Sequence, residues 1–93
     1  MKDEMETTAA EVQQFILGRI DDPLQAKGLA ANDVPSSFDL LLEGVIDSFG
    51  IVELISALEE RYGLEFEFDE LAPDDLTRIG PLSSYVARKL NGR

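Results

Sequence analysis

Apolar residues between positions 47 and 63 recur at the spacing of one face of an α-helix, and this pattern constrains the fold more than any other feature. The stripe consists of Ile51, Leu54, Ile55, Leu58 and Tyr62. A helix that begins at Asp47 or Ser48 and ends at Tyr62 would turn all of these side chains toward a core. Gly63 follows at the position where a left-handed residue commonly closes a helix. We therefore expect an amphipathic helix that packs against other helices.

A first helix is predicted from Thr7 or Thr8, either of which can cap it, to about Asp21. Its apolar positions form one stripe, made of Val12, Phe15, Ile16 and Ile20. We expect Asp22-Pro23 to end this helix, because the residue before a proline disfavours the helical region. Residues 24–38, which contain Gly, Asn, Asp, Pro and Ser, are then predicted to form a long loop.

The C-terminal third of the chain contains a connector and a last helix. The piece LEFEFDELAPDD alternates like a strand, but no second strand exists to pair with it, so we predict an extended connector. A short helical turn is expected after Pro73, around residues 74–76. The last helix is predicted from Thr77 or Gly80-Pro81 to Leu90. Its inward positions are Ile79, Leu82, Val86 and Leu90.

Together these elements predict an all-α fold, a small antiparallel bundle of three longer helices plus one short helix, with a long loop between the first and second helices. Residues 1–93 fit a single domain, and we expect residues 1–6 to be disordered. The N-terminus is polar and acidic where a secretory signal needs a basic start and an apolar run. No apolar run approaches the ~20 residues of a membrane span, so we expect a cytoplasmic protein.

Cysteine and histidine are both absent. Their absence removes disulfides, thiolate chemistry, imidazole bases and the usual zinc ligands. Neither an EF-hand calcium loop nor a Gly-rich phosphate loop occurs in the chain. We therefore expect no catalytic residue, no metal site and no enzymatic activity from the chain itself.

The net charge of -11 lies entirely between Asp39 and Asp75, where twelve acidic residues face a single base, Arg61. A field of this sign repels nucleic acid phosphates and anionic lipid, and it attracts basic protein surfaces. An acidic run can serve solubility alone, but its confinement to one half of the chain favours a docking face. We expect neither nucleic acid nor a membrane as partner.

Ser48 stands at the start of the central predicted helix, and three roles are open to it. A hydrolytic nucleophile is disfavoured, because the G-x-S-x-G pattern has Ile46 in place of its first glycine and the chain has no histidine base. A helix cap is the plainest role for a serine at this position, although Asp47 could cap equally well and leave Ser48 free. The third role is a point of attachment.

The segment DLLLEGVIDSFGIVELISALEERYGLEF, residues 39–66, resembles the acyl carrier protein family, including the related peptidyl carrier domains. The shared pattern is a leucine pair with an acid and a glycine, an aliphatic pair, an Asp-Ser dipeptide, and a helix that ends in an aromatic residue and a glycine. In this chain the pattern is Leu41-Leu42, Glu43, Gly44, Val45-Ile46, Asp47-Ser48, Val52-Glu53-Leu54, Leu58-Glu59-Glu60 and Tyr62-Gly63.

The resemblance implies that Ser48 carries a covalent 4'-phosphopantetheine derived from coenzyme A, with Asp47 and Phe49 beside it. The thiol of that group would hold an acyl or aminoacyl cargo as a thioester for fatty acid, polyketide or related biosynthesis. A phosphodiester on Ser48 would lie at the positive end of the helix, which favours an anion. The chain departs from the family at Phe49, where leucine or methionine is usual, and the larger ring changes the fit to a partner.

The implied partners are a phosphopantetheinyl transferase and the loading, synthase and transferase enzymes whose basic surfaces would dock on a monomer of this chain. The expected docking face comprises Phe49, Val52, Glu53, Ser56, Glu59 and Glu60. Val52 and Ser56 would form its small uncharged centre, and the glutamates its charged surround. The alternative is a non-catalytic acidic helical module that binds protein, in which Ser48 is only a helix cap.

Overall fold

The computed structural model describes residues 7–92, and the regular secondary structure of these residues is entirely helical. The α-helices are α1 (Ala9–Arg19), α2 (Asp21–Ala26), α3 (Ser48–Tyr62) and α4 (Ile79–Asn91). Three short 3-10 helices complete the described part of the chain, namely η2 (Ala31–Asp33), η3 (Phe68–Glu70) and η4 (Pro73–Leu76). The all-α prediction is confirmed for these residues, whereas the expected disorder of residues 1–6 lies outside them.

A capping box starts α1. The Thr8 hydroxyl accepts the N–H of Glu11 at 3.1 Å, and the Glu11 carboxylate accepts the N–H of Thr8 at 3.1 Å. Of the two candidate caps in the sequence, the structure uses Thr8. The apolar stripe predicted for this helix faces the core, with Val12 and Ile16 fully buried.

The prediction that Asp22-Pro23 ends the first helical segment is wrong. After a brief interruption at Ile20 the chain turns into α2, which runs through Pro23. Pro23 is the third residue of α2, and in the first turn of a helix its missing N–H costs no intrahelical hydrogen bond. Leu24 is 1% exposed and anchors α2 to the core, so the connection to α3 begins only at Lys27, and it contains η2.

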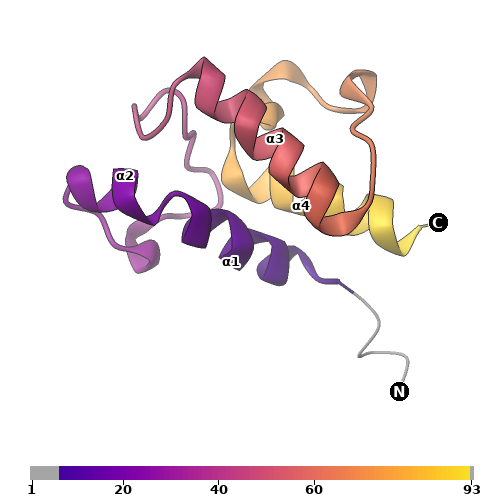
Figure 1. Cartoon of the computed structure of the whole chain (residues 1–93), viewed down its shortest axis with the longest axis horizontal. Coiled ribbons are helices and arrows are strands. Elements are labelled where there is room, and N and C mark those ends of the chain that lie inside the picture. Colours follow the sequence, from indigo (N-terminus) through magenta and orange to yellow (C-terminus); the bar gives the residue numbers. More distant parts are fainter. Residues whose placement is uncertain (1–6, 93) are drawn as a thin grey trace.

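A single core joins the helices. The largest fully buried side chains are Ile16, Leu24, Leu40, Leu58, Ile79 and Leu82. They come from all four α-helices and from the connection that precedes α3. Helix α1 packs against α4, and Figure 1 shows α3 crossing in front of α4 with α1 and α2 along one side. This arrangement leaves one long face of α3 toward solvent.

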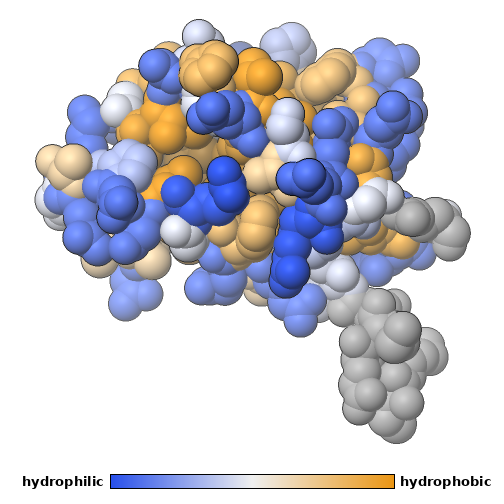
Figure 2. All heavy atoms as spheres, viewed as in Figure 1, coloured by the Kyte–Doolittle hydropathy of each residue, from blue (hydrophilic) through white to orange (hydrophobic). Residues whose placement is uncertain are grey.

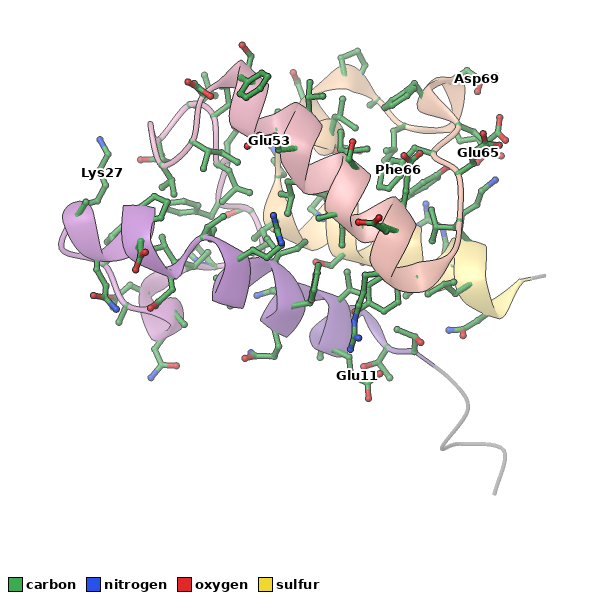
Figure 3. The ribbon with its side chains drawn as sticks, viewed as in Figure 1. Glu11, Lys27, Glu53, Glu65, Phe66 and Asp69 are labelled. Carbon is green, nitrogen blue, oxygen red and sulfur yellow. The ribbon has the colours of Figure 1, made fainter. Side chains whose placement is uncertain are left out.

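The segment after α3 is held to α4 by aromatic packing. Gly63 closes α3 with a φ of 66°, in the left-handed region expected for a C-terminal glycine. Phe66 is 6% exposed and packs against Tyr85, with ring centroids 5.1 Å apart and the rings tilted by 43°. Figure 3 shows Phe66 directed inward while Glu65 and Asp69 point away from the fold. The connector is extended apart from η3 and η4, and it forms no strand with any other described residue. The helical turn predicted around residues 74–76 is present as η4.

Candidate functional site

Ser48 is the first residue of α3, and Asp47 is the cap of that helix. The Asp47 carboxylate accepts the N–H of Gly50 at 2.8 Å. Because Asp47 fills the capping role, the alternative in which Ser48 caps the helix is wrong. The Ser48 side chain is exposed, and its hydroxyl makes no hydrogen bond to any residue between Thr7 and Gly92.

The backbone at the start of α3 is also available to a ligand. The N–H groups of Ser48 and Phe49 have no acceptor within the described part of the chain, because the carboxylate of Asp47 takes the N–H of Gly50 and its carbonyl takes that of Ile51. Unsatisfied N–H groups and the helix dipole give this end a partial positive charge. The residues present therefore fit a phosphodiester on Ser48, whose negative charge this end of the helix would favour.

One buried carboxylate organises the turn before α3. Asp39 is 9% exposed, and one of its oxygens accepts the N–H groups of Leu41 and Leu42, both at 3.0 Å. The other oxygen accepts the hydroxyl of Thr77 at 2.9 Å. Burial alone would raise the pKa of Asp39, but these donors, led by the N–H of Leu42, outweigh it and lower the pKa. No pattern in the sequence singled out this residue as an organising group.

The same turn is joined by its backbone to the start of α4. The hydrogen bonds run from the N–H of Leu40 to Thr77, from Ile79 to Phe38 and from Gly80 to Ser36, at 2.8–3.0 Å. Asp39 and Thr77 are 38 residues apart in the chain, so these bonds connect segments that no local pattern relates. The position at which the chain enters α3, and with it Ser48, depends on this junction.

The predicted docking residues lie on or near the solvent face of α3. Phe49 and Val52 are 69% and 59% exposed, and Glu53, Ser56 and Glu60 are exposed as well. Glu59 differs, since it is half-buried and its carboxylate accepts the N–H of Phe66 at 2.8 Å. Glu59 therefore holds the connector against α3, and the other predicted residues are open to a partner.

Two shallow pockets flank Val52 and Ser56. One, of about 250 Å³, has mostly apolar walls from Ile51, Ile55, Phe68 and Leu76. The other lies toward α1 and is lined by Arg19, Glu53, Ala57 and Glu60. Figure 2 shows apolar atoms gathered over the beginning of α3 and the segment beyond it, with hydrophilic residues around them.

Two other strongly exposed apolar side chains were not predicted from the sequence. Phe68 is 58% exposed and Leu42 is 82% exposed. The alternation of Phe66 and Phe68 in the sequence signals that one ring is buried and the other is not, but it does not say which. Leu42 belongs to the leucine pair of the carrier pattern, and nothing in that pattern shows that its side chain points into solvent.

Comparison with protein-family models, with curated proteins and with solved structures yields no match to this chain. Among the helices within residues 7–92, none combines the length and the apolar character that crossing a bilayer requires.

Proposed function

We propose that this protein is an acyl carrier protein of the cytoplasm, which carries its cargo on 4'-phosphopantetheine attached to Ser48. The observation that carries the proposal is the division of roles at the start of α3. Asp47 caps the helix, and the adjacent Ser48 is exposed with an uncommitted hydroxyl. A serine kept only for helix stability would take the capping position, where its hydroxyl contributes about 1 kcal/mol.

The attachment step needs an enzyme in addition to this chain. The Ser48 oxygen attacks the phosphorus of coenzyme A that bears the pantetheine arm. One phosphorus–oxygen bond forms to Ser48, and the bond to the departing adenosine bisphosphate breaks. The hydroxyl proton passes to a base of the phosphopantetheinyl transferase, since this chain contains no histidine. Once bound, the group supplies a thiol that holds the cargo as a thioester, and the chain itself remains non-catalytic.

The finer arrangement of the fold suits this role. We take α1, α3 and α4 as the three longer helices of an antiparallel bundle, with α2 as the short helix in the connection between α1 and α3. One face of α3 then belongs to the core, and the other presents Val52, Glu53 and Ser56 to partner enzymes. A monomer is sufficient, because Ser48 and this face belong to one chain.

Charge and shape favour particular partners and cargo. The exposed carboxylates of Glu53 and Glu60 would attract enzymes with basic docking surfaces, which is consistent with the concentration of negative charge in this half of the chain. The pocket beside Val52 has mostly apolar walls, including Phe68 and Leu76. This lining favours an acyl cargo over a polar aminoacyl one.

The test is the intact mass of the protein after incubation with coenzyme A and a transferase of broad specificity. The wild-type chain should gain the mass of one phosphopantetheinyl group, and Ser48→Ala should gain none while keeping its helical circular dichroism. Ser37→Ala is the matched control, because Ser37 is also exposed but lies outside the predicted docking face. If Ser48→Ala still gains the mass, the group is attached to a residue other than Ser48. A wild-type chain that gains no mass would favour the acidic protein-binding module.

A further inference from the structure

The turn before α3 combines a very exposed leucine with a firmly held backbone. Leu42 is 82% exposed, more than any other large apolar side chain of the described residues. Its N–H is nevertheless bound by the buried carboxylate of Asp39 at 3.0 Å. A leucine side chain in water contributes nothing to the core, whereas the carboxylate that fixes its backbone has to be desolvated. The held backbone fixes the place of this exposed side chain on the surface.

The backbone around Leu42 has little freedom to move. The N–H of Glu43 is bound by the carbonyl of Asp39 at 2.9 Å, and that of Gly44 by the carbonyl of Leu41 at 3.0 Å. The Thr77 hydroxyl donates to the second oxygen of Asp39, which connects the turn to the segment leading into α4. Asp39 therefore has a donor on each oxygen, and its charge is stabilised where it lies.

We infer that Leu42 is a recognition side chain for the enzyme that modifies Ser48, and that Asp39 and Thr77 are positioning residues that hold it in place. This inference rests on the proposed function of Ser48. The surface of that enzyme would offer an apolar pocket for Leu42, with basic residues around it that complement the exposed carboxylates of Glu43 and Asp47. Thr77 acts through Asp39 and does not touch the partner in this scheme.

Two kinds of variant separate recognition from positioning. Leu42→Ala removes an exposed side chain and leaves the hydrogen bonds of the turn intact. Thr77→Val removes the hydroxyl that donates to Asp39, but keeps the branched shape and the carbonyl that accepts from Leu40. Thr77→Ser restores the hydroxyl and serves as the conservative rescue. Gln14→Ala is the matched surface control, because Gln14 is exposed on α1, far from the turn in the sequence.

The experiment measures kcat and KM for coenzyme A-dependent loading of Ser48, well below the melting temperature of every variant. Leu42→Ala should raise the KM for this protein about tenfold, the effect of losing the burial of one leucine at an interface, with its Tm unchanged. Thr77→Val should also raise KM, by about threefold or more. Thr77→Ser and Gln14→Ala should both remain close to the wild type.

Each possible result of this experiment tests a different part of the inference. Loading of Leu42→Ala with the wild-type KM would overturn the recognition role and leave the proposed function standing. A Thr77→Val protein with a lowered Tm but the wild-type KM would show that the Asp39–Thr77 contact is only structural, which overturns the positioning role. Failure of the wild-type protein to load would remove the proposed function, and this inference with it.

Discussion

Replacing Ser83 by alanine should stabilise this protein. Ser83 lies in α4 and is 0% exposed, and its hydroxyl has no hydrogen-bond partner within residues 7–92. A serine inside a helix commonly donates to the carbonyl four residues earlier, here that of Ile79, but this bond is not made. The hydroxyl has therefore lost its water and gained no partner on folding.

The size of the effect follows from two contributions of the same sign. A buried polar group without a partner costs about 1–3 kcal/mol. Alanine also has a better helix propensity than serine, by about 0.5 kcal/mol. The serine oxygen does make van der Waals interactions that alanine cannot make, and this difference offsets a part of the gain. We expect Ser83→Ala to raise the free energy of unfolding by about 1–2 kcal/mol, which raises Tm by about 5–10 °C in a domain of this size.

Thermal and denaturant unfolding followed by circular dichroism measure this change. Ser84→Ala is the matched control, because Ser84 is the next residue of α4 and is only half-buried. That variant gains the propensity contribution alone and should be stabilised by no more than about 0.5 kcal/mol. If Ser83→Ala proves no more stable than Ser84→Ala, the Ser83 hydroxyl has a partner in solution and the reasoning fails.

Three further predictions concern the junction and the charge. In Gly80→Ala the new Cβ would lie 2.5 Å from the Cβ of Ser36 and 2.6 Å from its carbonyl oxygen, so denaturant unfolding should show a loss of about 1–3 kcal/mol; an unchanged midpoint would mean that the junction is loose. The pKa of Asp39 is lowered from its ordinary value of 3.8, so its stabilisation is complete above that pH and is lost as the pH falls through the folded-state value. Acid unfolding of Asp39→Asn should accordingly be less steep than that of the wild type, and equal slopes would contradict the shift. Raising monovalent salt from about 0.01 M to about 0.15 M should raise Tm by screening the acidic half, whereas a constant Tm would indicate that the carboxylates are too dispersed to repel one another.

The features of the fold that local signals encode were predictable from the sequence. The periodic stripe of α3, its predicted start at Asp47 or Ser48, and its end at Tyr62 with Gly63 as the closing residue all agree with the structure, because periodicity, capping and the left-handed glycine act within one helix. The error at Pro23 has a physical reason. A proline disrupts the interior of a helix but is tolerated in its first turn, which is where Pro23 lies in α2, and the buried Leu24 ties this short helix to the core.

In the candidate site too, only the residues marked by local sequence signals could be predicted. Asp47 and Ser48 could be named because a cap and its neighbour are adjacent in the chain. Asp39 could not, because its importance comes from Thr77, which is distant in sequence and reaches it through the turn and the start of α4. The same holds for Phe68, which is exposed because its neighbour Phe66 takes the place against Tyr85.

The positions of the basic residues explain why the carboxylates on the exposed face of α3 are not neutralised by ion pairs. Arg61, the one base in the acidic half, lies 5.6 Å from the ring centres of both Phe15 and Tyr62, so it serves the packing of α1 on α3. The salt bridges within residues 7–92 engage Asp75 and Glu70, and neither acid belongs to α3. The carboxylates on the exposed face of α3 therefore have no ion-pair partner in the described structure, and their charge is available to an approaching basic surface. The phosphodiester of the proposed function would add a further negative charge at Ser48, and the positive end of α3, with its uncommitted N–H groups, would offset part of that charge.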